Sequence, residues 1–316
     1  MESSGARRGR RARPPRRRAL LCTALAVVAV GGVTAAGTVY VQGRARPAAV
    51  AVSSAAAPTA TASAGAGEEA SVREPAAVDR KALLSAAMAK IGVPTGARVS
   101  AAVLAPGSGE SAVYGDASFD TASIVKVDIL AALLLQAQDA GRRLTAPERA
   151  YATKMIVNSD NASATALWHT IGRAAGLDAA NERFGLTGTS GGDGELWGLT
   201  RTTAADQLVL LQQVFGERSK LSAASRTYLE GLMKSVEPDQ RWGVSAAAEG
   251  NSWALKNGWL PRSTTGLWDV NSIGRVTVDG TDYLVAVLSD GTASQARGIS
   301  LVEAAAKAAV GVFGDE

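Results

Sequence analysis

A long apolar stretch, residues 124–135, constrains the fold of this chain more than any other feature. Almost every residue in it is hydrophobic, with Asp128 as the main exception, and Gly141 follows it. An apolar segment of this length with a glycine behind it predicts a helix. Because the helix is apolar nearly all round, we expect it in the centre of a domain, and it is too short to span a membrane.

Ser123 and Lys126 lie at the start of this helix, three residues apart and therefore on one face. In the first turn the backbone N–H groups lack helical partners and the helix dipole is positive, which suits a nucleophile whose attack creates an oxyanion. A hydroxyl needs a base, and the desolvated neutral amine of a lysine can serve. Taken alone, a capping serine and an ordinary helical lysine are the commoner explanation of such a pair.

The amino terminus predicts export. Residues 1–18 carry eight arginines and one glutamate, and residues 19–41 are apolar and uncharged. A basic segment followed by an apolar one indicates a signal peptide or an uncleaved signal-anchor, and this one is long enough to span a bilayer. The positive-inside rule then leaves the rest of the chain outside the cytoplasm, either membrane-anchored or secreted after cleavage.

Composition separates the next segment from the folded part. Residues 42–77 are rich in Ala, Ser, Thr, Pro and Gly, which predicts a disordered linker. The chain carries +4 overall, but residues 1–18 contribute +7 and two further arginines precede residue 47, so residues 47–316 carry −5. The electrostatics therefore give no reason to expect nucleic-acid binding. The only cysteine, Cys22, excludes an intramolecular disulfide, and a single histidine, His169, excludes a multi-histidine zinc site.

Residues 78–316 are long enough for one domain of about 240 residues. The hydrophobic spacing predicts strands in both terminal parts and helices between them. We expect strands at 98–104, 111–114, 253–260, 268–278 and 283–288, with a hairpin turn at Asp279-Gly280. We expect further helices at 79–91, 147–157, 162–171, 175–184, 202–215, 222–235 and 293–313. The simplest architecture is α+β: an antiparallel sheet built from both ends of the domain, flanked by the terminal helices, with an all-helical subdomain.

Two further motifs carry polar groups. Ser159-Asp160-Asn161 lies between two predicted helices, where by itself it would be a turn and helix cap. Lys256-Asn257-Gly258 lies in an apolar predicted strand; a partly buried lysine there needs a partner or an anionic ligand, although a solvated edge lysine is equally common. Gly258 would let a substrate backbone approach the strand closely.

Taken together and in this order, the motifs Ser123-x-x-Lys126, Ser159-Asp160-Asn161 and Lys256-x-Gly258 resemble those of the penicillin-recognising serine hydrolases, and class A β-lactamases most closely. The resemblance covers most of residues 78–316. It implies that Ser123 is the acylated nucleophile, that Lys126 is its base, and that Ser159 relays a proton to the leaving nitrogen.

The same resemblance implies substrate-binding roles. Asn161 would hold a side-chain amide of the substrate, and Lys256 would supply positive charge for its carboxylate. The backbone N–H groups of Ser123 and Trp259 would form the oxyanion hole. Asn257, beside Gly258, replaces the usual Thr or Ser, and would put an amide near the substrate carboxylate.

Glu195 is the candidate for the carboxylate that activates the deacylating water, but the surrounding loop is shorter than in class A enzymes, and an exposed loop carboxylate is an alternative reading. Without such a base the acyl-enzyme would be long-lived, as in penicillin-binding proteins. A Ser-His-Asp triad would need His169, for which a packing or surface role in a helix is the better explanation.

We therefore expect an extracytoplasmic, monomeric serine hydrolase without metal or cofactor, acting on a β-lactam or a peptidoglycan-type peptide, with β-lactam hydrolysis as the expected activity and antibiotic resistance as its consequence. Two alternatives remain open. One is a D,D-peptidase-like or esterase-like relative, and the other is a non-catalytic module that binds cell wall or β-lactams.

Overall fold

The computed structural model describes residues 78–314. The predicted basic segment, apolar span and linker lie outside the described residues. Within residues 78–314, no helix has both the length and the apolar character that a membrane crossing requires.

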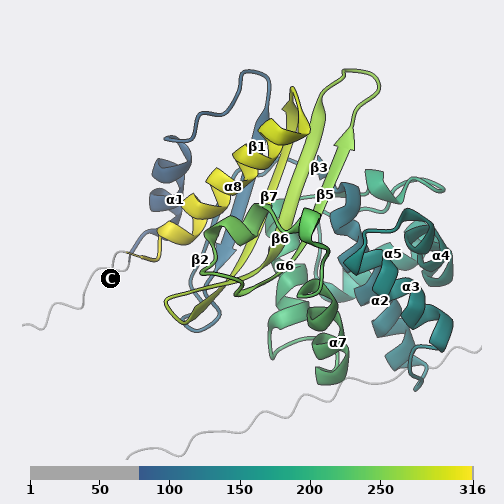
Figure 1. The fold of residues 1–316 in the computed structure, drawn as a ribbon. Coiled ribbons are helices and arrows are strands. Elements are labelled where there is room, and N and C mark those ends of the chain that lie inside the picture. Colours follow the sequence, from purple (N-terminus) through teal and green to yellow (C-terminus); the bar gives the residue numbers. More distant parts are fainter. Residues whose placement is uncertain (1–77, 315–316) are drawn as a thin grey trace, which may run out of the picture. The chain divides into compact units, whose positions relative to one another are not determined.

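The described residues form an α+β domain around one five-stranded antiparallel sheet, as the sequence predicts (Figure 1). The strand order is β2-β1-β7-β6-β5, so strands from the two ends of the domain pair in the middle of the sheet. Both turn residues of the β6–β7 hairpin, Asp279 and Gly280, have positive φ (48° and 73°), as a type I′ turn requires. The strands are β1 (Arg98–Leu104), β2 (Ser111–Tyr114), β5 (Trp253–Pro261), β6 (Trp268–Val278) and β7 (Thr281–Thr292).

Both faces of the sheet are covered. Successive side chains of β1 enter different hydrophobic clusters: Ala101 and Val103 join one, and Ala102 and Leu104 join the other. The terminal helices α1 and α8 pack on the first face, and α6 packs on the second. The helices are α1 (Arg80–Met88), α2 (Val125–Asp139), α3 (Ala146–Val157), α4 (Asn161–Ile171), α5 (Arg173–Phe184), α6 (Ala204–Phe215), α7 (Ala223–Met233) and α8 (Gln295–Gly311).

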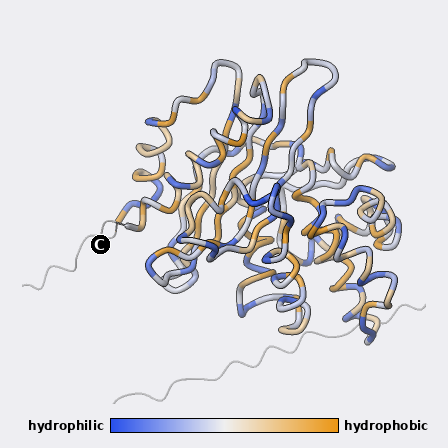
Figure 2. The backbone as a smooth tube through the Cα atoms, in the orientation of Figure 1, coloured by the Kyte–Doolittle hydropathy of each residue, from blue (hydrophilic) through white to orange (hydrophobic). Residues whose placement is uncertain are grey.

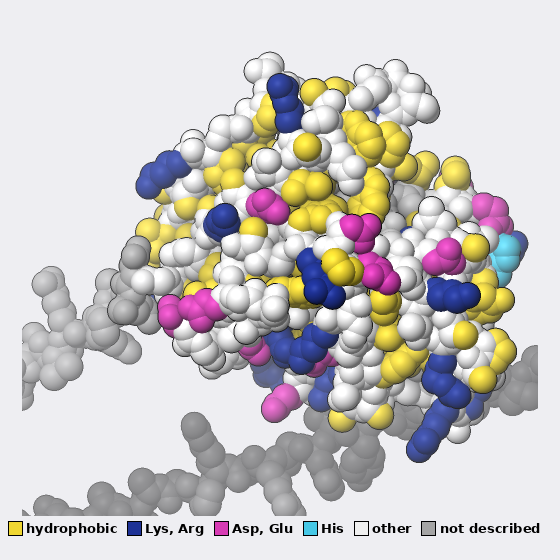
Figure 3. Space-filling view, viewed as in Figure 1, with side chains coloured by type: hydrophobic (Ala, Val, Ile, Leu, Met, Phe, Trp, Pro, Cys, Tyr) yellow, Lys and Arg dark blue, Asp and Glu magenta, His cyan; other side chains and the backbone are white. Residues whose placement is uncertain are grey.

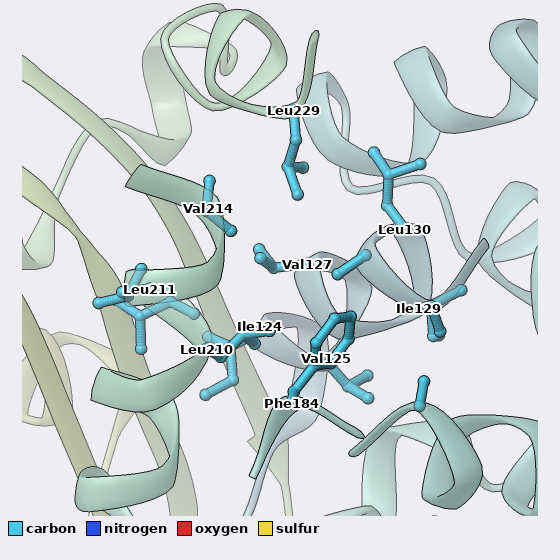
Figure 4. Close-up of a cluster of buried hydrophobic side chains, with 14 of the residues drawn as sticks. Ile124, Val125, Val127, Ile129, Leu130, Phe184, Leu210, Leu211, Val214 and Leu229 are labelled. Carbon is cyan, nitrogen blue, oxygen red and sulfur yellow. The ribbon is translucent and has the colours of Figure 1, made fainter. Parts of the chain in front are cut away.

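Helix α2 lies in the middle of the helical subdomain, in contact with α3, α4, α5 and α7. Every residue from Val125 to Leu135 is buried, which confirms the prediction from its all-round apolar sequence. Figure 4 shows Val127 and Leu130 of α2 among side chains of α6 and α7. Figure 2 shows hydrophobic positions along both the strands and the helices of the domain. The catalytic candidates near the start of α2 therefore stand on a rigid, fully packed element.

The boundaries differ from the prediction at one functionally relevant point. Ser123 lies in a 3₁₀ turn, η1 (Ala122–Ile124), and α2 itself begins at Val125. Two short strands, β3 (Phe119–Asp120) and β4 (Arg201–Thr202), were not predicted. Two residues are too few to show a period-2 pattern, so only the pairing partner defines such a strand.

The visible surface of the domain mixes both signs of charge. Figure 3 shows basic and acidic side chains interspersed over this face, without one continuous basic area.

Candidate active site

Ser123 lies where the helical subdomain meets the edge strand β5. A methyl group on Gly258 would come within 2.7 Å of the Ser123 backbone nitrogen and 2.8 Å of the Thr121 carbonyl oxygen. Real Cβ atoms do not make backbone contacts this short. Glycine therefore lets β5 run directly against the turn that carries the nucleophile.

The turn before Ser123 is held in an unusual conformation. Ala122 has φ of 48°, a region that residues with a side chain rarely adopt. The side chain of Asn271 on β6 donates hydrogen bonds to the carbonyls of Asp120 (2.9 Å) and Thr121 (3.0 Å), and the Thr121 N–H donates to the Thr200 carbonyl (2.9 Å). Surrounding structure thus fixes the strained backbone, as is common at functional sites.

Lys126 is fully buried on α2, and its amine is surrounded by the Ser159–Asn161 motif. Its Nζ donates to the Ser159 carbonyl (2.6 Å), the Ser159 hydroxyl (3.0 Å) and Oδ1 of Asn161 (2.8 Å). Burial lowers the pKa of Lys126 to about 7, and the nearby charge of Asp160 opposes that shift. A substantial fraction of this amine is therefore neutral near pH 7 and can accept a proton.

Lys256 reaches the same hydroxyl from the sheet. Its buried Nζ donates to the Ser159 hydroxyl (3.0 Å) and to the Asn257 carbonyl (2.9 Å). Burial lowers the pKa of Lys256 well below its usual value, and the amine of Lys126 adds to this effect. Ser159 therefore bridges two amines, one on a helix and one on a strand, and can pass a proton between them.

The Ser159-Asp160-Asn161 turn is also a helix cap, as its composition suggests. Asp160 caps α4 by accepting a hydrogen bond from the Ser163 N–H (2.7 Å). Hydrogen bonding by the side chain and the N–H of Ser163 lowers the pKa of Asp160. Ser159 has φ of 55°, and the Asp160 N–H donates to the Lys154 carbonyl at the end of α3 (3.1 Å). The cap thus directs Ser159 and Asn161 toward Lys126.

The structure places Asn257 differently from the prediction. Its side-chain amide donates to the carbonyls of Gln240 (2.7 Å) and Trp242 (2.9 Å), and the residue is buried. Successive residues of a strand point to opposite faces, so Asn257 points away from the face on which Lys256 contacts Ser159. Its amide therefore supports a neighbouring turn, and a role toward a substrate carboxylate stays a prediction.

Trp259, the other predicted oxyanion residue, follows Gly258 on β5. Its half-buried ring packs against Trp242, with the ring centroids 5.9 Å apart. The position of its backbone beside the Ser123 turn is consistent with an oxyanion role, which stays a prediction.

Glu195 does not sit among the catalytic groups that the sequence associated with it. Its carboxylate is about half exposed and pairs with Nε2 of His169 (2.6 Å) and Nε of Arg173 (3.0 Å). These partners lower the pKa of Glu195, His169 being the larger cause. His169, the sole histidine, is thus paired with a loop carboxylate on the surface of α4.

Trp197 is the residue of this loop that contacts the site, and sequence reasoning missed it. The Lys126 Nζ lies 5.0 Å from the centroid of the Trp197 ring. The only sequence signal was an aromatic residue two positions after the expected base. Among residues 78–314, no cluster of His, Cys, Asp or Glu suited to a metal ion is found.

One family model and several solved structures match this chain. The family model described as "Beta-lactamase enzyme family" matches residues 143–313, more than half of the chain, and the matched region includes Ser159 and Lys256. No curated protein matches the chain.

Solved structures share the fold. PBP-A is 20% identical with a TM-score of 0.65 over 74% of this chain and 97% of its own. A β-lactamase from Burkholderia vietnamiensis is 21% identical with a TM-score of 0.61, covering 77% of this chain and 99% of its own. A class A β-lactamase representative from Bacteroides cellulosilyticus is 16% identical with a TM-score of 0.64, covering 75% of this chain and 99% of its own. With the match over residues 143–313 and the Ser159-centred pair of lysines, the chain belongs to the beta-lactamase enzyme family.

Proposed function

We propose that this protein is a serine hydrolase that forms an acyl-enzyme on Ser123, with a β-lactam or a peptidoglycan-type peptide as substrate. The observation that carries the proposal is the Ser159 hydroxyl, which lies 3.0 Å from both the Lys126 and the Lys256 amine. One of the solved relatives, a PBP-A variant, is described as an acyl-enzyme complex with penicillin G.

In the proposed reaction each of these groups has one role. Ser123 Oγ attacks the substrate carbonyl and its proton passes to neutral Lys126, while the backbone N–H groups of Ser123 and Trp259 face the oxyanion. When the tetrahedral intermediate collapses, the C–N bond breaks. The proton reaches the departing nitrogen through Ser159, which leaves Lys126 neutral again. A substrate carboxylate near Lys256 would raise the pKa of that buried amine and favour its charged form.

A long-lived acyl-enzyme is the second candidate outcome, and Glu195 favours it. In the structure this carboxylate is bound by His169 and Arg173. A protein that is acylated without rapid turnover would act as a D,D-peptidase-like relative, whereas rapid cleavage of simple esters without reaction with β-lactams would indicate an esterase.

The test uses the full chain and its Ser123→Ala variant, incubated with penicillin G and with a chromogenic cephalosporin. Intact-protein mass spectrometry detects a covalent adduct, and absorbance detects turnover. We expect an adduct that Ser123→Ala lacks. Absence of both adduct and turnover would overturn the proposal, and reversible binding that survives Ser123→Ala would instead favour a binding module.

We further propose that residues 78–316 act outside the cytoplasm, supported by the basic and apolar character of residues 1–41. Protease added to intact cells and to spheroplasts tests this location. The domain should be cleaved only when the protease reaches the extracytoplasmic side, and protection in spheroplasts would contradict the proposal.

A further inference from the structure

The loop that joins α5 to β4 is held by contacts with helices α4 and α5. Trp168 of α4 is buried and its Nε1 donates to the Gly194 carbonyl (2.8 Å). The next residue, Glu195, binds His169 on α4 and Arg173 on α5. Three contacts from two helices therefore fix the loop at one point, immediately before Trp197.

The ring of Trp197, which follows these contacts in the sequence, lies beside the amine of Lys126. Trp197 begins the 3₁₀ turn η2 (Trp197–Leu199), and its Nε1 donates to the Thr165 hydroxyl on α4 (3.1 Å). Its ring is half-buried against the core of the helical subdomain and lies 5.0 Å from Lys126 Nζ. A tethered ring of this size excludes water from the side of Lys126 that it covers.

The far end of the loop joins the turn of the nucleophile. The Thr121 N–H donates to the Thr200 carbonyl (2.9 Å), and the Thr121 hydroxyl donates to the Gly198 carbonyl (3.5 Å). Trp197 thus lies on a loop that is fixed both to α4 and to the segment leading into Ser123. Movement of this loop would change the surroundings of both Ser123 and Lys126.

We propose that Trp197 is a positioning residue that keeps water away from Lys126, so that Ser123 is acylated readily while the acyl-enzyme is hydrolysed slowly. The inference rests on the proposed function and deepens it. A hydrolytic water needs a base and two or more polar partners, and the face of an indole offers neither. Glu195 then acts as an anchor of the loop, and not as the base of deacylation.

The same geometry predicts a change at Lys126. Its amine faces Ser159, Asn161 and the Trp197 ring, with Asp160 and Lys256 as the charged neighbours. Burial is the main cause of its lowered pKa, and the ring contributes to that burial. The ring also attracts the charged amine, but a cation–π contact is a smaller effect than the loss of hydration. Removing the ring should therefore raise the pKa of Lys126.

The experiment compares Trp197→Ala and Trp197→Gln, which admit water, with Trp197→Phe, which keeps an apolar ring. Leu196→Ala alters the exposed neighbour and serves as the matched control. Single-turnover mass spectrometry with penicillin G gives the rates of acylation and deacylation from pH 5 to 9. We expect Trp197→Ala and Trp197→Gln to deacylate at least tenfold faster than the wild type. In both variants the midpoint of the pH profile of the acylation rate should move upward. Trp197→Phe and Leu196→Ala should keep a deacylation rate and an acylation pH profile close to those of the wild type.

Glu195→Gln separates the two roles of that residue. If Glu195 is a loop anchor, the variant deacylates as fast as the wild type or faster. If Glu195 is the base, deacylation slows by orders of magnitude, and the inference fails. It also fails if Trp197→Ala changes neither deacylation nor the pH midpoint.

Titration of Lys126 provides a readout that needs no substrate. In the full chain labelled biosynthetically with ¹³C- and ¹⁵N-lysine, NMR follows the titration of the Lys126 amine in the wild type and in Trp197→Ala. If the titration midpoint of Lys126 is the same in Trp197→Ala and in the wild type, Trp197 does not keep water from this amine. This result would hold even if Ser123 formed no adduct at all. Failure of the proposed function and failure of this inference are therefore distinguishable.

Discussion

Gly258 on β5 lies so close to Ser123 that a methyl group at position 258 would be 2.7 Å from the Ser123 backbone nitrogen. The obstructing atoms belong to backbone, and not to a flexible side chain, so neither segment can give way locally. The sheet and the helical subdomain are thus joined at the nucleophile by a contact that only glycine permits.

Gly258→Ala should therefore separate β5 from the Ser123 turn. We expect at least ~100-fold slower acylation, because a displacement of about 1 Å at reacting groups has this effect. Single-turnover mass spectrometry measures it. Gly231→Ala is the control, since a methyl group there meets no atom within 4 Å and alanine favours the helix. Equal acylation by Gly258→Ala and the wild type would show that the contact does not position Ser123.

The pKa of Lys126, about 7, predicts the pH dependence of acylation. The amine acts as a base only when neutral, so the acylation rate should rise with pH through about 7 and level off above it. Lys126→Met should lose most of the acylation rate at every pH, because it removes the amine that is assigned to take the proton of Ser123. A rate that is independent of pH between 5 and 9 would contradict the assignment of Lys126 as the base.

Ser159 can be tested apart from the strain that it carries. Its φ of 55° disfavours any residue with a Cβ, so Ser159→Gly should relieve strain of about 1 kcal/mol while removing the bridging hydroxyl. We expect Ser159→Gly to be at least as stable as Ser159→Ala, and both to be acylated ~100-fold more slowly or worse. Thermal unfolding and single-turnover rates together check this. Near-normal acylation in either variant would exclude Ser159 as the proton relay.

Asn257 should matter for stability and not for chemistry. Its amide donates to the carbonyls of Gln240 and Trp242, so Asn257→Thr should lower the free energy of unfolding by about 1–3 kcal/mol. Acylation of the folded variant should stay close to that of the wild type. The opposite pattern, unchanged urea unfolding with much slower acylation, would restore the substrate-binding role that its position in the motif suggests.

The fold was predictable because its elements are long and periodic. The apolar run from Val125 to Leu135 predicts a buried helix, and the strand patterns on either side of Asp279-Gly280 predict a hairpin. The order of the motifs predicts that Lys126 and Lys256 both contact Ser159 only because it resembles that of a known family. Residues 126 and 256 lie far apart in the sequence, and tertiary packing alone brings them to Ser159. Their roles in a reaction stay a prediction.

Glu195 and Asn257 show where such reasoning stops. Asn257 stands in a motif and Glu195 is the candidate carboxylate of a loop, yet the direction of each side chain depends on local geometry. The alternation of β5 turns Asn257 away from Lys256, and His169 with Arg173 hold Glu195 at the surface. Trp197 gave no motif signal because its contact with Lys126 depends on the path of an irregular loop.

Asp128 provides a prediction for the pH dependence of stability. It is buried on α2, and burial raises its pKa to about 8. The side chain of Asn181 opposes this shift, while Asp178 and Asp206 add to it. The folded state therefore keeps a proton that the unfolded state loses above pH ~4, so this residue's contribution to stability should decline as pH rises from about 4 to 8.

Asp128→Asn removes that titration while keeping the size of the side chain. We expect little difference from the wild type at pH 4.5 and a gain of about 2 kcal/mol or more at pH 8, measured by urea unfolding at both values. Asp116→Asn, the same change at an exposed carboxylate, is the matched control. If Asp128→Asn changes stability equally at both pH values, the buried carboxyl does not hold a proton in the folded protein, and its burial must be compensated by the amide of Asn181 instead.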